Sequence, residues 1–69
     1  MKISARNTLK GKIVEIVKGA TTSHVRIDIG GGTVVTASIT NEAVAELKLE
    51  AGKQAYAVIK ASDVMVGID

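Results

Sequence analysis

The stretch SHVRIDIGGGTVVTASI, residues 23–39, decides the fold. Up to residue 29 it alternates apolar or small side chains with polar ones, which is the period of a half-buried β-strand. Three glycines at residues 30–32 permit the positive φ angles of a tight reversal, and residues 33–39 resume the strand pattern. The stretch therefore predicts a β-hairpin. Its expected inward-facing residues are Ser23, Val25, Ile27, Ile29, Val35, Ala37 and Ile39.

The segments on either side of this hairpin add further strands and one helix. Residues 10–18, KGKIVEIVK, are rich in β-branched side chains and predict a strand, which a turn at residues 19–22 joins to the hairpin. TNEAVAELK, residues 40–48, combines a capping threonine, an early glutamate and apolar residues at helical spacing, which predicts a helix of about two turns. QAYAVIK, residues 54–60, and VMVGI, residues 64–68, predict two more strands.

The predicted order of three strands, a helix and two strands matches a known small β architecture. A five-stranded barrel of the OB type has this order, with the helix between strands 3 and 4 closing one end. The expected fold class is therefore mainly β, an OB-like barrel. No linker or repeat divides the chain, so residues 1–69 are expected to form a single domain, with KISAR at residues 2–6 as an added strand or arm. The pattern leaves open whether this arm pairs with its own subunit or with a neighbour.

Composition limits how so small a chain can be stabilised. A chain of 69 residues buries only about 60% of the surface that its unfolded form exposes. There is no cysteine for disulfides, and one histidine cannot build a zinc site alone. Although 46% of the residues are apolar, Tyr56 is the only aromatic one, so small aliphatic side chains must form the core. We therefore expect a homo-oligomer that covers apolar surface left exposed on each subunit.

The polar residues also narrow the possible functions. The carboxylates show no paired spacing, and His24 has no nucleophile to activate, so we expect no enzyme and no metal held by side chains. A net charge of +2 and a single tyrosine suit nucleic acid poorly, because single-strand binding relies on aromatic stacking. Basic residues alone could still hold phosphates, which keeps a nucleic-acid-binding OB module as an alternative. No apolar signal segment or membrane span is visible, so we expect a cytoplasmic protein without a membrane partner.

Two short segments near opposite ends of the chain combine hydrogen-bond donors. They are SARN, residues 4–7, and KAS, residues 60–62. Each segment alone is explained by an ordinary solvated charge on the surface. Together they offer a guanidinium, an ammonium, two hydroxyls and backbone amides, which could replace the hydration shell of a small dianion. The donors are Ser4, Ala5, Arg6, Lys60, Ala61 and Ser62.

At these residues the sequence resembles the molbindin, or Mop, family, whose unit is also the TOBE module of molybdate transporters and regulators. The resemblance rests on SARNTLKGKIVEI at residues 4–16, TNEAVAELKL at residues 40–49 and AYAVIKASDVMVG at residues 55–67. It implies a cytoplasmic protein that stores molybdate or tungstate without chemical change and without a cofactor. It also implies a hexamer, built as a trimer of dimers, with oxyanions at subunit interfaces. A sensing module that passes the molybdate signal to a partner protein is the remaining alternative.

The resemblance also implies two classes of binding site. In the first class, Arg6 and Lys60 are expected to supply charge, Ser4 and Ser62 hydroxyls, and Ala5 and Ala61 backbone amides. For the second class our candidate is GATTS, residues 19–23, because turn amides and hydroxyls could form an anion-binding nest. An ordinary turn between strands explains that segment equally well. The second-class candidates are Gly19, Ala20, Thr22 and Ser23.

Overall fold

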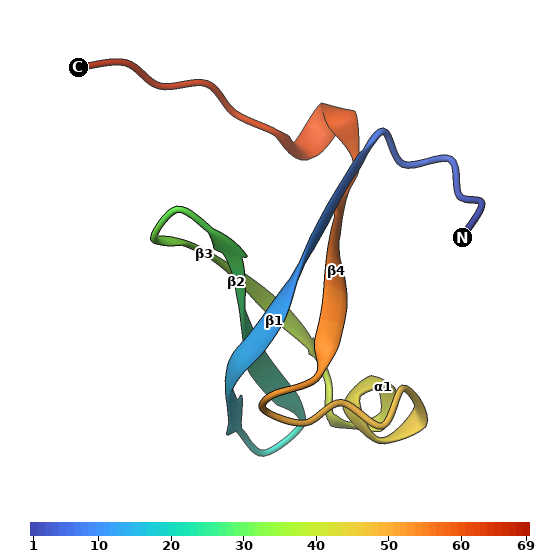
Figure 1. The fold of residues 1–69 in the computed structure, drawn as a ribbon. Coiled ribbons are helices and arrows are strands. Elements are labelled where there is room, and N and C mark those ends of the chain that lie inside the picture. Colours follow the sequence, from blue (N-terminus) through green and yellow to red (C-terminus); the bar gives the residue numbers. More distant parts are fainter.

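The structure is a computed structural model that describes residues 1–69, and it consists of a curled antiparallel sheet with one short α-helix (Figure 1). The strands lie in the order β3-β2-β1-β4, with bounds β1 Asn7–Lys18, β2 Thr22–Gly30, β3 Thr33–Thr40 and β4 Gln54–Ile59. Helix α1, Asn41–Glu46, connects β3 to β4, and the 3-10 turn η1, Ala61–Asp63, follows β4. The predicted mainly β class, with a helix between strands 3 and 4, is confirmed.

The hairpin predicted from residues 23–39 is present as β2 and β3. In their antiparallel register Val25 lies opposite Ala37 and Ile27 opposite Val35. All the side chains expected to face inward are buried or half-buried. The three glycines of the turn have φ angles of 98°, 62° and 81°, a region that side chains disfavour. The alternating side chains of the two strands and the glycines of their turn therefore both favour this hairpin.

Strand β1 is bent, so that its two halves pair with different neighbours. Residues 7–12 pair with β4, and residues 12–18 pair with β2. The register with β2 shifts at Val14, which lies between Ile13 and Glu15 and has no partner, and a bulge of this kind bends a strand. The bend curls the sheet (Figure 1), and one small core lies inside the curl. The buried hydrophobic residues are Ile13, Val25, Ile27 and Ala57.

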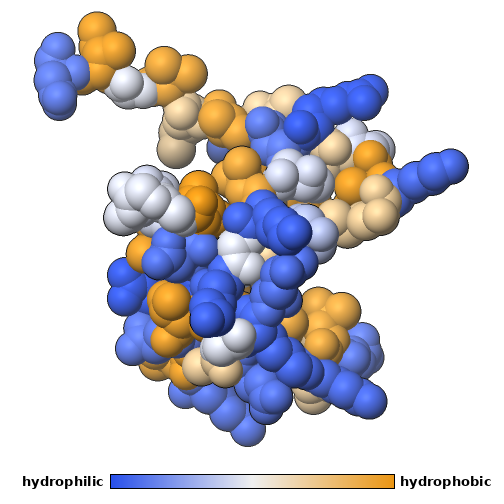
Figure 2. Space-filling model, in the orientation of Figure 1, coloured by the Kyte–Doolittle hydropathy of each residue, from blue (hydrophilic) through white to orange (hydrophobic).

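The predicted fifth strand at residues 64–68 is wrong for the single chain. Met65, Val66 and Ile68 are 93%, 93% and 96% exposed, and no strand pairs with this segment. The turn η1, closed by the Asp63 amide donating to the Lys60 carbonyl at 2.9 Å, leads the chain away from the sheet (Figure 1). The tail stands out from the body as a largely hydrophobic arm (Figure 2). A strand forms only where its backbone lies along a sheet edge, and this tail does not run along either edge strand of its own chain, β3 or β4.

Other element boundaries also differ from the prediction. Strand β1 begins at Asn7 rather than Lys10, because its start pairs with the end of β4. Residues 2–6 form no strand. Helix α1 ends at Glu46, earlier than predicted, because the next two residues form its C-terminal turn. Both α1 and η1 are too short to cross a membrane.

Candidate functional site

The pairing of β1 with β4 brings the two donor segments to one end of the sheet. Asn7 lies opposite Ile59, and its side-chain Nδ2 donates to the Ile59 carbonyl at 3.3 Å. The residues immediately beyond this pair are Arg6 and Lys60. The two segments therefore leave the sheet at the same place, although they lie near opposite ends of the sequence (Figure 1).

The donors of these segments are free within the chain. The side chains of Ser4, Arg6, Lys60 and Ser62 are exposed and make no hydrogen bond or ion pair. The chain's two ion pairs join Arg26 to Glu15 and Lys53 to Glu50 instead. The backbone amide of Ala5 also donates to no carbonyl. Two cations without acidic partners, beside free hydroxyl and amide donors, form a group suited to an oxyanion.

Beyond this meeting point the two segments diverge. The N-terminal arm runs to one side, while η1 and the tail run to the other (Figure 1). Ala61 and Ser62 lie in η1, and Ala5 is half-buried where the arm joins β1. A single chain thus presents both halves of the donor set on an open surface.

The second candidate segment, Gly19–Ser23, lies at the other end of β1. The Gly19 amide donates to the Thr22 carbonyl at 2.8 Å and closes the turn between β1 and β2. Ser23 is only 1% exposed, and its hydroxyl donates to Asn41 Oδ1, so this donor is already used. The Ala20 amide, in contrast, donates to no carbonyl. The segment therefore offers fewer free donors than the sequence suggested.

Asn41 is a residue that sequence reasoning missed. Its side-chain Nδ2 donates to the carbonyls of Gly19 and Ala20 at 3.0 and 3.4 Å, and its backbone amide donates to the Thr21 carbonyl at 2.9 Å. Asn41 thereby ties the start of α1 to the β1–β2 turn. The only signal in the sequence was that an asparagine follows the capping Thr40. A polar residue is ordinary at the start of a helix, so this signal did not point to a contact with the turn.

No three His, Cys, Asp or Glu side chains lie together in a group that could hold a metal ion. Such ligand groups are what direct coordination by side chains requires. The donors of residues 4–6 and 60–62 offer hydrogen bonds and positive charge, which suit an anion.

Comparison with known proteins agrees with this fold. Residues 3–66 match the TOBE domain family. A probable molybdenum-pterin-binding protein of Haemophilus influenzae is 58% identical over 69 residues, which is 100% of both chains. The solved structure of the cytoplasmic molybdate-binding protein ModG with molybdate bound has a TM-score of 0.94 and 46% identity, covering 100% of this chain and 49% of that one.

A second solved structure matches over its full length. The molybdate-binding protein from Sporomusa ovata has a TM-score of 0.90 and 40% identity, covering 99% of this chain and 100% of that one. The family match thus includes nearly the whole chain, and the Haemophilus relative is of the same length. This chain belongs to the molbindin, or Mop, family of TOBE domains.

Proposed function

We propose that this protein binds molybdate and tungstate without chemical change and serves as a cytoplasmic store of the oxyanion. The observation that carries this proposal is the meeting of the Arg6 and Lys60 segments at one end of the β1–β4 pair, with donors that have no partner in the chain. The names of two structural neighbours support the ligand, since one is a molybdate-binding protein and the other holds molybdate. ModG is described as cytoplasmic, which supports the location.

Each residue of the first site has a role that its chemistry suits. Arg6 and Lys60 balance the two negative charges, Ser4 and Ser62 donate from their hydroxyls, and the backbone amides of Ala5 and Ala61 complete the shell. A shell made only of donors disfavours phosphate, because hydrogen phosphate carries a proton that needs an acceptor. Sulfate has no such proton, so only the size of the site would exclude it. Molybdate and tungstate are similar in size, and we expect little discrimination between them.

A homo-oligomer completes the proposal, as a hexamer made of three dimers with oxyanions at the subunit interfaces. Only four hydrophobic residues are buried, whereas the apolar tail Val64–Ile68 is exposed. Full burial of one large aliphatic side chain contributes about 1.5–3 kcal/mol, so a second copy that covered this tail would stabilise the chain substantially. An edge strand of a neighbour would supply the partner that the predicted fifth strand lacks. Gly19, Ala20, Thr22 and Ser23 remain the proposed second site.

Isothermal titration calorimetry with sodium molybdate tests the binding function. We expect submillimolar affinity for the wild type, and at least a tenfold weaker Kd, about 1.4 kcal/mol, for Arg6→Ala and for Lys60→Ala. Arg26→Ala and Lys12→Ala remove the same charges elsewhere on the sheet and are expected to bind like the wild type. A wild-type protein that gives no heat, or control variants that lose as much affinity as the site variants, would overturn the proposal.

A further inference from the structure

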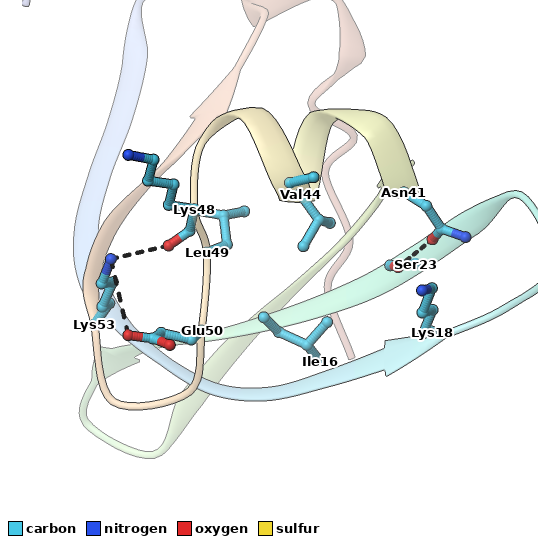
Figure 3. A pocket seen from close by; sticks show the side chains of 10 residues that line it. Ile16, Lys18, Ser23, Asn41, Val44, Lys48, Leu49, Glu50 and Lys53 are labelled. Atoms are coloured by element: carbon cyan, nitrogen blue, oxygen red, sulfur yellow. Dashed lines mark hydrogen bonds and ion pairs between the residues drawn. The ribbon is translucent and has the colours of Figure 1, made fainter.

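A separate cavity of about 460 Å³ lies between α1, the end of β1 and the start of β2 (Figure 3). Arg6 and Lys60 lie at the opposite end of β1. Small-molecule sites in proteins have volumes of roughly 300–1,000 Å³, so this cavity is large enough for an organic molecule. It belongs to neither donor segment of the first site.

The middle of the cavity is apolar. Ile16 comes from β1, Val44 from α1 and Leu49 from the loop after the helix, and all three pack against the core while remaining partly exposed (Figure 3). Aliphatic surface of this kind offers no hydrogen bonds to an inorganic oxyanion. It suits the apolar body of an organic ligand.

The rim of the cavity is cationic. Lys18 lies at one end, beside the Ser23–Asn41 pair, and takes part in no ion pair (Figure 3). At the other end Lys53 is neutralised, since its Nζ lies 3.9 Å from Glu50 Oε1 and donates to the Lys48 carbonyl at 2.9 Å. The side chain of Lys48 points away from Ile16, Val44 and Leu49 (Figure 3). Lys18 is therefore the lysine of the rim whose uncompensated charge is available to a ligand.

Lys48 has an unusual backbone conformation. Its φ is +53°, and it is the one non-glycine residue of the chain with a positive φ. It follows the C-cap of α1, where glycine is the usual residue, and the Leu49 amide donates to the Val44 carbonyl at 3.1 Å across this turn. A side chain in the left-handed region is disfavoured, and the C-terminal turn of α1 accounts for this conformation of Lys48.

We propose that this cavity binds a small organic anion. The apolar body of the ligand lies on Ile16, Val44 and Leu49. Its acidic group pairs with Lys18. The site is independent of the oxyanion site at Arg6 and Lys60, because the two share no residue and lie at opposite ends of β1.

Fluorescence titration of the full-length protein tests this site with two probes of similar shape. The first is 8-anilinonaphthalene-1-sulfonate, an organic anion, and the second is N-phenyl-1-naphthylamine, which has the same kind of apolar body without the charge. Every titration is done without molybdate on protein that carries Arg6→Ala, so that the sulfonate does not occupy the Arg6 site and no molybdate competes at Ser23, which lines the cavity. We expect Lys18→Ala to weaken binding of the anionic probe at least fivefold and to leave the neutral probe within twofold. Val44→Ser is expected to weaken both probes.

Lys48→Gly is a second control at the edge of the cavity. Glycine accepts a φ of +53°, so we expect the melting temperature to rise by about 4–8 °C, while the affinity for the anionic probe stays within twofold because this side chain points away from the cavity. Lys10→Ala, which removes a lysine from β1 outside the cavity, is the matched control and should change neither probe. The proposal is overturned if Lys18→Ala behaves like Lys10→Ala, or if Val44→Ser leaves both probes unaffected.

Discussion

At the scale of single residues, Gly11 controls how β1 lies against β2. A Cβ at this position would lie 2.4 Å from the Asp28 carbonyl oxygen and 2.8 Å from Ile27 Cγ2. The carbonyl belongs to the backbone of β2, next to the pairing of Lys12 with Asp28, so it cannot move without disturbing the sheet. No pattern in the sequence distinguished this glycine from an ordinary one. The close approach arises only when the two strands are packed together.

Gly11→Ala should therefore destabilise the protein. We expect the free energy of unfolding to fall by about 2–3 kcal/mol, the cost of overpacking against backbone. Urea denaturation at a fixed protein concentration measures the change, since association contributes to stability. Lys10→Ala is the control, because it changes the neighbouring exposed residue of the same strand and adds no atom. Equal losses in the two variants would contradict the steric explanation.

Asn41 and Ser23 form a polar pair whose members are not equivalent. Ser23 is buried, and Asn41 accepts the hydrogen bond from its hydroxyl. Asn41→Ala leaves this hydroxyl without its partner and also frees the turn carbonyls, so we expect a loss of about 2 kcal/mol. Ser23→Ala removes the hydroxyl itself and should cost less, and the double variant should cost less than the sum of the two. Urea denaturation of all three variants checks this order, and additive losses would argue against coupling.

At the scale of elements, α1 depends on its ends. A helix of six residues is too short to be stable alone, and it contains no fully buried residue. Its start is held by Thr40 Oγ1, which accepts from the Ala43 amide at 3.1 Å. Asn41 ties the same end to the β1–β2 turn. The start of the helix could be predicted because a capping residue acts locally, whereas its end depended on the strained turn at Lys48.

Thr40→Ala should show the contribution of this cap. Losing the acceptor for the Ala43 amide is expected to lower the free energy of unfolding by about 1 kcal/mol. Thr40→Ser keeps a hydroxyl and should recover most of that loss, which distinguishes the cap from the packing of the threonine methyl group in β3. The melting temperatures of the two variants provide the comparison. Identical values for alanine and serine would show that the hydroxyl does not stabilise the helix.

At the scale of the whole molecule, the chain keeps much of its apolar surface exposed. The core is small, and the tail residues Met65, Val66 and Ile68 are almost fully accessible. Exposed apolar surface of this extent is typical of an interface. The sheet order β3-β2-β1-β4 also leaves β3 and β4 as edge strands, to which a neighbour can add.

Val66→Asp tests whether the tail holds subunits together. A carboxylate at a covered apolar site is costly to bury, so we expect native mass spectrometry to show smaller species than for the wild type. The circular dichroism spectrum should retain its β signature, because Val66 contacts no core residue of its own chain. Asp69→Ala, a change at the end of the same tail, should leave the assembly intact. Unchanged assembly in Val66→Asp would exclude the tail from the interface.

Several features were determined by the sequence alone. The β2–β3 hairpin, its glycine turn and the start of α1 followed from side-chain period, φ preference and capping, which act over a few neighbouring residues. The donor types at Arg6 and Lys60 were also visible, as was the resemblance to molbindins. These features depend on neighbouring residues only, so they can be predicted without knowledge of the rest of the fold.

Only the tertiary structure decided how the distant parts meet. The β1–β4 register places Arg6 and Lys60 at the same end of the sheet, because Asn7 pairs with Ile59 across most of the chain. It also decided that Asn41 holds a turn, that Lys48 lies at the rim of a cavity, and that residues 64–68 find no partner strand. Strand pairing and cavity shape depend on contacts between residues far apart in sequence, and a local pattern of side chains does not encode which edges are free.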